Sequence, residues 1–146
     1  QLPYGRMGTT AAALLFTAEE VYACNLGDSR IYRLRDRVLT QMSVDDNELA
    51  PEGSENRKTP LTQYLGVFSD ELTLVPHLVK SELRPGDFYL LCSDGLTDML
   101  PNVVIADCIR QHTSVKQSTE HLIRAALQNG GRDNISVIGI KVSELR

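Results

Sequence analysis

Three aspartates stand where an apolar, β-prone run gives way to a turn: Asp28, Asp94 and Asp133. Each has a glycine one to three positions away, and Asp98 follows Asp94 by one helical turn. Because glycine lets backbone and solvent approach closely, carboxylates beside it offer hard oxygen ligands of the kind that Mg²⁺ or Mn²⁺ prefers. Aspartate also serves turns without binding anything. The residues alone leave both interpretations open.

A cysteine nucleophile is a second possibility, since the run from Cys24 to Arg30 has the C-x5-R spacing of cysteine-dependent phosphatases. In those enzymes the phosphate-binding loop leads into a helix whose N-terminus faces the anion. Here the residues after Arg30 are β-prone, and Asp28 would place a negative charge inside the loop. We therefore disfavour this chemistry.

Other residue types give no competing metal site. The histidines lack zinc-ligand spacing and are interpreted as surface or helix-face residues: His77, His112 and His121. The acidic run 45–48 lacks the periodicity of a calcium-binding EF-hand. Cys24, Cys92 and Cys108 are isolated among apolar neighbours and predict free thiols in a reducing compartment.

Composition places the chain among ordinary globular proteins. Its 146 residues are 42% hydrophobic and 23% charged, with a net charge of −4. We expect a single domain over residues 1–146 in the cytoplasm. The mild negative charge argues against a nucleic-acid partner, and the longest apolar stretch, 11–16, argues against a membrane span.

The elements that would position the aspartates follow from hydrophobic periodicity. Strands are predicted over 8–16, 21–26, 31–35, 72–83, 87–92 and 135–142. Gly27-Asp28-Ser29 suggests a hairpin between the second and third of these, and the polar stretch 43–59 suggests a long exposed loop. Helices are predicted over 61–65, over 102–111 and from the cap Ser114 to the Gly130-Gly131 pair. The class is therefore α+β, with helices packed on a largely antiparallel sheet.

Six motifs occur in the order found in the metal-dependent serine/threonine protein phosphatases of type 2C, the PPM family. They are Gly8-Thr9-Thr10-Ala11, Asn25-Leu26-Gly27-Asp28-Ser29-Arg30, Leu61-Thr62-Gln63-Tyr64-Leu65-Gly66, Pro85-Gly86-Asp87, Leu91-Cys92-Ser93-Asp94-Gly95-Leu96-Thr97-Asp98 and Gly131-Arg132-Asp133-Asn134-Ile135. Any one motif is a weak signal, but their shared order is a strong one. Over essentially its whole length the chain resembles the compact bacterial members of this family.

The resemblance implies an antiparallel β-sandwich flanked by helices on both faces, with a metal centre at one end. Asp94 and Asp133 then correspond to ligands of the catalytic metal pair, and Asn134 to the residue that orients Asp133. Asp28 and Asp98, together with Asp94, resemble the ligands of a third metal present in some members. The loop 43–59 corresponds to a mobile flap beside the site.

The same resemblance implies the chemistry. Two Mn²⁺ or Mg²⁺ ions would activate a water that hydrolyses phosphoserine or phosphothreonine, with no covalent phospho-enzyme. The partner would be a phosphorylated protein, the substrate of an opposing serine/threonine kinase, which makes the protein a signalling hydrolase.

The chain also departs from the family pattern. Members carry an earlier Asp-Gly whose aspartate bridges the two metals, and an early arginine that binds phosphate, whereas Asp94-Gly95 is the only Asp-Gly here. Asp45-Asp46 also stands where members carry an Asp-His pair. Because the chain opens at Gln1, without methionine and just before the Gly-Thr-Thr motif, we interpret it as a partial phosphatase domain that lacks its N-terminal strands.

Two expectations follow from that interpretation. The isolated chain should be inactive, and its unpaired sheet edges and apolar sheet face should favour self-association. The alternative is a phosphatase-fold module that binds or regulates without catalysis.

Overall fold

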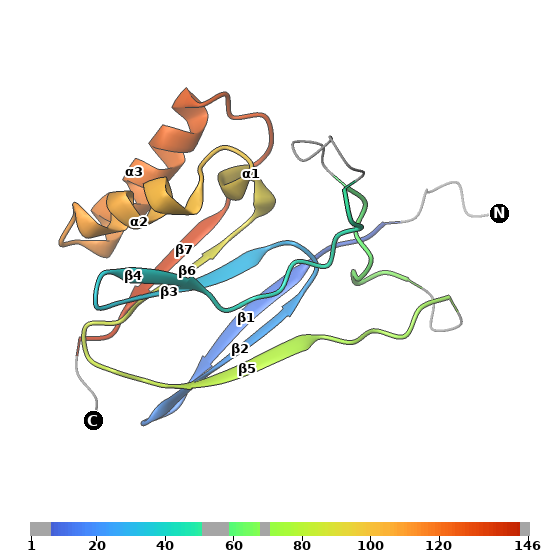
Figure 1. Ribbon diagram of the computed structural model, residues 1–146, viewed down its shortest axis with the longest axis horizontal. Coiled ribbons are helices and arrows are strands. Elements are labelled where there is room, and N and C mark those ends of the chain that lie inside the picture. Colours follow the sequence, from blue (N-terminus) through green and yellow to red (C-terminus); the bar gives the residue numbers. More distant parts are fainter. Residues whose placement is uncertain (1–6, 51–58, 68–70, 144–146) are drawn as a thin grey trace.

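Two antiparallel sheets pack face to face in the computed structural model, which describes residues 7–50, 59–67 and 71–143 (Figure 1). The three-stranded sheet has the order β1 (Ala11–Phe16), β2 (Glu20–Leu26) and β5 (His77–Glu82). The four-stranded sheet has the order β4 (Val38–Gln41), β3 (Arg30–Arg35), β6 (Phe88–Cys92) and β7 (Val137–Lys141). The expected antiparallel sandwich is confirmed.

The predicted hairpin between β2 and β3 is wrong, because these strands belong to different sheets. The hairpins of the structure are β1–β2 and β3–β4. The reason lies in β3, where the neighbouring residues Ile31 and Tyr32 are both fully buried on opposite faces. A strand that is buried on both faces must lie inside a layered structure, so the turn at Gly27 carries the chain from one sheet to the other.

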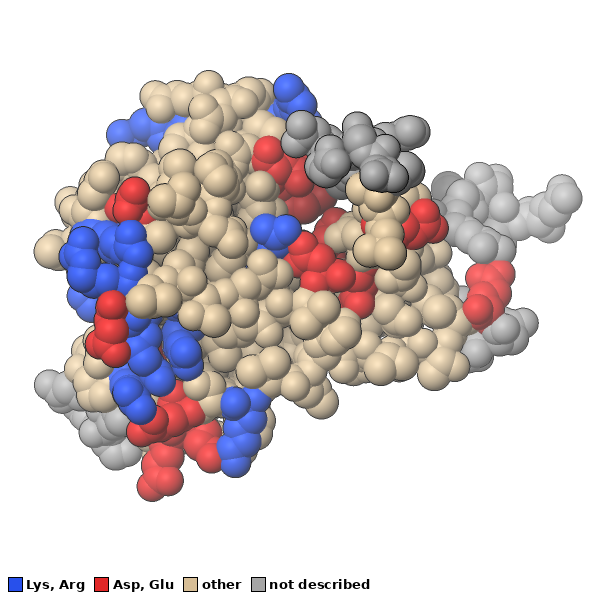
Figure 2. All heavy atoms as spheres, in the orientation of Figure 1, with Lys and Arg blue, Asp and Glu red and all other residues tan. Residues whose placement is uncertain are grey.

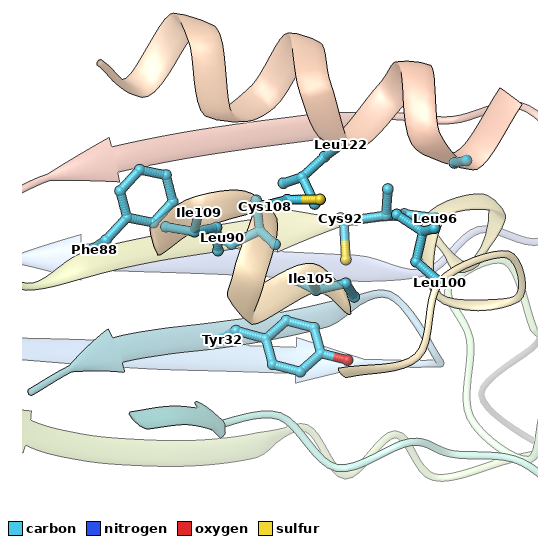
Figure 3. Close-up of a cluster of buried hydrophobic side chains, with 11 residues drawn as sticks. Tyr32, Phe88, Leu90, Cys92, Leu96, Leu100, Ile105, Cys108, Ile109 and Leu122 are labelled. Atoms are coloured by element: carbon cyan, nitrogen blue, oxygen red, sulfur yellow. The ribbon is translucent and has the colours of Figure 1, made fainter. Parts of the chain in front are cut away.

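Three helices cover the outer face of the four-stranded sheet: α1 (Asp94–Thr97), α2 (Asn102–Arg110) and α3 (Val115–Gln128) (Figure 1). Between sheet and helices lies a core that includes Tyr32, Leu90, Leu96, Ile105 and Leu122 (Figure 3). Burying a side chain of this size stabilises the fold by ~1.5–3 kcal/mol. This core fixes α1, and with it the start of the helical region at Asp94.

The cap predicted for α3 is confirmed, since the Gln117 amide donates to the Ser114 hydroxyl. The helix ends before Gly130 and Gly131, which both adopt positive φ. The buried residues of α3 include Leu122 and Ala126, whereas the side chain of Leu127 is exposed.

The helix predicted over 61–65 is wrong. Leu61 and Leu65 instead form single β-bridges with Asn47 and Thr9, so an extended segment joins two loops. Of the helices that the structure describes, all three lie on one sheet, and the outer face of the three-stranded sheet exposes Leu15 and Leu78. Within the described ranges, no helix combines the length and apolarity that crossing a bilayer requires.

Candidate metal centre

Strand register brings the first two aspartates to the same end of the four-stranded sheet. Arg30 at the start of β3 pairs with Cys92 at the end of β6, so the residues that precede Arg30 and those that follow Cys92 lie side by side. Asp28 and Asp94 are each two residues beyond this pair. Asp98 follows from α1, where its amide donates to the Asp94 carbonyl at 2.8 Å.

These three aspartates line one cleft of about 210 Å³. Its other lining residues come mainly from the segment after β4: Arg30, Asp45, Asn47, Glu48, Ala50, Thr59 and Thr97. A second hollow, of about 610 Å³, shares Asp28, Thr59 and Asp94 with the first and adds hydroxyl groups from Thr9, Thr10, Ser29 and Ser93. Figure 2 shows acidic side chains gathered on this face near α1.

Asp133 reaches the site through the backbone beside Gly95. A Cβ on Gly95 would collide with the Asn134 carbonyl, so glycine is required for the two turns to touch. The Ser93 hydroxyl donates to that carbonyl at 3.2 Å and accepts from the Ser136 amide at 3.0 Å. The turn of Asp133 is thereby fastened beside Asp94, although Asp133 itself lies outside the walls of the two hollows described above.

Asn134 contacts Asp133 through its main chain. Its amide donates to Asp133 Oδ1 at 2.7 Å, which fixes the carboxylate relative to the turn. The orienting role expected for Asn134 therefore stays a prediction, with this hydrogen bond as its structural basis.

Arg30 places a cation in the wall of the acidic cleft, where it is bound to Asp45. Its Nε and Nη2 donate to the Asp45 carboxylate at 2.6–3.0 Å, and Nη1 donates to the Tyr32 hydroxyl at 3.1 Å. Burial is the largest single influence and lowers the pKa of Arg30, but its hydrogen bonds and electrostatic attraction with Asp45 and Tyr32 together outweigh burial and hold the pKa above its ordinary value. Because Arg30 is engaged in this way, it does not form the phosphate cradle of a cysteine-dependent enzyme. Asp94 sits next to Cys92, whose thiol pKa burial raises to about 12.

The segment after β4 is laid against the β2–β3 turn, so the prediction of an exposed loop is wrong for its first part. Asn25 Nδ2 donates to the Val44 carbonyl at 2.6 Å, and Asn47 Nδ2 donates to Asp28 Oδ2 at 3.2 Å. Ser43 and Asp46 are buried. Polar side chains can be buried here because backbone groups satisfy their hydrogen bonds. The polar composition of the segment predicts exposure and does not reveal these hydrogen bonds. Residues 51–58 of the predicted flap lie outside the described residues.

The donor chemistry of the cleft fits a hard divalent cation. Asp28, Asp94 and Asp98 line it and carry carboxylate oxygens, and Asn47 lines it too, with its Nδ2 donating to Asp28. Within the described ranges, no three His, Cys, Asp or Glu side chains gather closely enough to hold an ion by themselves. The three aspartates thus have the chemical type that such a cation prefers. They lie on separate walls of the cleft.

His77 is a residue of this region that sequence reasoning assigned to the surface. Its Nε2 lies 2.7 Å from Asp46 Oδ1, whose carboxylate also accepts from the Gly27 amide next to Asp28. Asp46 and His77 are 31 positions apart, and neither belongs to a spacing motif. Only the fold reveals the pair.

Known proteins are similar to this chain in sequence. Residues 1–135 match the family described as Protein phosphatase 2C. A serine/threonine protein phosphatase, PstP of Mycobacterium tuberculosis, is 39% identical over 139 residues, which cover 90% of this chain and 27% of that protein. The protein phosphatase PhpP of Streptococcus pneumoniae is 33% identical over 152 residues, covering 97% of this chain and 61% of that protein.

Solved protein structures are similar to this chain in fold. The crystal structure of M. tuberculosis PstP superimposes with a TM-score of 0.83 at 34% identity, covering 94% of this chain and 61% of that one. The catalytic domain of PstP in complex with two manganese ions superimposes with a TM-score of 0.79 at 35% identity, with 94% and 60% covered. The chain thus spans at most about three-fifths of these relatives, and it belongs to the protein phosphatase 2C family.

Proposed function

We propose that the protein containing this chain is a metal-dependent phosphatase that hydrolyses phosphoserine and phosphothreonine in other proteins. The observation that carries the proposal is the cleft that Asp28, Asp94 and Asp98 line at one end of a protein phosphatase 2C fold. The manganese complex of PstP supports the choice of a divalent cation.

Each aspartate has its own task in this proposal. Asp94 and Asp133, whose neighbours Ser93 and Gly95 contact the Asn134 carbonyl, would hold the catalytic pair of Mn²⁺ or Mg²⁺ ions. Asp28 and Asp98 hold a third ion together with Asp94. Bound divalent cations neutralise charge on the phosphoryl oxygens and lower the pKa of a nearby water, which removes the need for a covalent intermediate.

The chain's own residues keep this geometry fixed. The Arg30–Asp45 pair holds the cleft wall, and Asn47 ties Asp28 to the segment after β4. We propose that residues 43–59 act as the flap of a single phosphatase domain. The described residues Glu48, Ala50 and Thr59 of this segment line the acidic cleft, which supports that role.

The partner in this proposal is a phosphorylated protein in the cytoplasm, opposite a serine/threonine kinase. The names of the relatives, which are serine/threonine protein phosphatases, support the substrate class. The free thiols Cys24, Cys92 and Cys108 support a reducing compartment.

The isolated chain is proposed to be inactive, since it spans only part of its relatives and carries one Asp-Gly. It is also proposed to self-associate through the outer face of the three-stranded sheet, where Leu15 is 65% and Leu78 73% exposed.

The test compares the complete protein with the 146-residue chain, using a phosphothreonine peptide and excess Mn²⁺. We expect manganese-dependent phosphate release from the complete protein and none from the chain. A complete protein that folds and binds phosphopeptide but releases no phosphate would instead support the non-catalytic binding module.

A further inference from the structure

The Asp46 carboxylate connects the turn of Asp28 to the three-stranded sheet. Its Oδ2 accepts from the Gly27 amide at 2.8 Å, and its Oδ1 lies 2.7 Å from His77 Nε2. We propose that Asp46 and His77 form a clamp that fixes the Gly27-Asp28 turn, so that both are positioning residues for the carboxylate of Asp28. This inference rests on the proposed function only in taking Asp28 as a cation ligand.

The clamp holds the turn from two sides. The Asp46 amide donates to the Gly27 carbonyl at 3.2 Å while its side chain receives the Gly27 amide, so the peptide groups on either side of Gly27 are both bound to one residue. The Asp46 carbonyl in turn accepts from the Thr62 amide at 2.8 Å. Asp46 is therefore fixed independently of the turn that it holds.

Gly27 occupies a backbone conformation and a space that only glycine tolerates. Its φ is +96°, and its Cα faces Thr10, whose side chain already fills the space that a Cβ would need. Glycine has the largest conformational freedom of any residue, so the bond to Asp46 restricts the backbone that leads into Asp28, while Asn47 Nδ2 donates to the Asp28 carboxylate itself. The Asp46 bond removes that freedom immediately before the ligand.

His77 gives the carboxylate its partner. It is the first residue of β5 and pairs with Asn25, which places it at the cleft end of the three-stranded sheet. Asp46 is 8% exposed and His77 34%, so the carboxylate is buried while the imidazole reaches solvent. A buried polar group needs a hydrogen-bond partner, and His77 supplies one to Asp46 Oδ1 while the Gly27 amide donates to Oδ2.

Four variants of the 146-residue chain test the clamp, with Mn²⁺ as the probe. Mn²⁺ affinity is followed by water-proton relaxation, and exchange of the Gly27 amide by NMR. Asp46→Ala removes both bonds and should weaken Mn²⁺ binding about tenfold, as loss of a supporting residue behind a ligand does. It should also speed exchange of the Gly27 amide by about tenfold. Asp46→Asn keeps an acceptor for Gly27 and a group to face His77, so both readouts should stay close to wild type.

The matched control is Asp107→Ala, which removes one exposed carboxylate from α2, on the far side of the four-stranded sheet. It should change neither readout. His77→Ala removes only the outer half of the clamp, and its exchange rate should fall between those of wild type and Asp46→Ala. It takes the place of Asp46→Ala if that variant does not fold.

The outcomes separate the clamp from the proposed function. Wild-type exchange at Gly27 in Asp46→Ala, or equal losses in Asp46→Ala and Asp107→Ala, would overturn the clamp. Failure of the wild-type chain to bind Mn²⁺ would contradict the cation site instead, and the Gly27 exchange rates would still decide the clamp.

Discussion

The carbonyl oxygen of Asn134 occupies the space that a side chain on Gly95 would need, so the start of α1 and a loop 39 positions later in sequence touch backbone to backbone. This contact holds Asp133 beside Asp94. Gly95→Ala should push the loops apart and reduce the activity of the complete protein at least about tenfold, because catalytic geometry tolerates little displacement. Phosphopeptide hydrolysis at saturating Mn²⁺ measures the effect.

Gly86→Ala is the control for that substitution. Gly86 has a φ of +90°, which is strained for any residue with a Cβ, but no heavy atom lies within 4 Å of its added Cβ, and it lies outside the cleft walls. It should cost about 1 kcal/mol of stability and no activity. Equal activity losses in the two variants would mean that the Gly95 contact has no special role.

Asp28→Ala should weaken Mn²⁺ binding by the 146-residue chain, because it removes one of the carboxylates that line the cleft. Glu48→Gln removes a charge from the same cleft at a position that we do not assign as a ligand, and it should have a much smaller effect. Water-proton relaxation during Mn²⁺ titration gives both affinities. Binding that is unchanged by Asp28→Ala would exclude Asp28 as a ligand.

Asp87 should make stability depend on pH. It is buried, and its carboxylate accepts from Arg35 Nε and Nη2 at 2.7 Å each. Burial is the largest single influence and raises the pKa of Asp87, but the hydrogen bonds from Arg35, the Arg84 amide and Tyr89, with the charge of Arg35, together outweigh burial and hold the pKa below its ordinary value of 3.8. The stabilisation is therefore complete above about pH 5 and is lost as the pH falls through the lowered pKa.

Asp87→Asn should accordingly lower the free energy of unfolding by about 3 kcal/mol at pH 7. The difference from wild type should narrow below pH 3.8, where the wild-type carboxylate begins to protonate in the unfolded chain. Urea unfolding at pH 7 and below pH 3.8 measures this difference in the free energy of unfolding. Asp107→Asn, in an exposed pair with Arg110, should change stability by less than about 1 kcal/mol at either pH.

Self-association of the isolated chain should depend on the outer face of the three-stranded sheet. Replacing Leu15 and Leu78, both highly exposed, by lysine should shift the chain toward monomer in size-exclusion chromatography. Val103→Lys and Val38→Lys, at exposed apolar positions on α2 and β4, serve as controls. A chain that is monomeric before any substitution would contradict the proposal.

Local patterns were sufficient to predict much of the fold. Three features depend only on residues close in sequence, and the structure confirms them. They are the apolar strand at 88–92, the helix that buries Ile105 and Ile109, and the helix cap at Ser114. The sheet assignment of β2 and β3 was not predictable in this way. A turn such as Gly27-Asp28-Ser29 reverses the chain equally well within one sheet or between two.

The part of the site that lies at strand ends could be predicted from the sequence. Asp28 and Asp94 end up in one cleft because their strands end at the same edge of the sandwich. The pairs Arg30–Asp45 and Asp46–His77 were missed because each joins residues that only the packed sheets bring together. The short helix α1 was missed because its four residues are too few for a periodic signal.

The most direct test of the central claim is manganese-dependent hydrolysis of a phosphothreonine peptide by three variants of the complete protein. Asp94→Asn and Asp133→Asn should each abolish turnover while leaving circular dichroism and the unfolding midpoint close to wild type, because asparagine keeps the size and shape of aspartate and one side-chain acceptor oxygen. Glu48→Gln, in the same cleft, should stay active. Near-normal turnover in Asp94→Asn or Asp133→Asn would contradict the account.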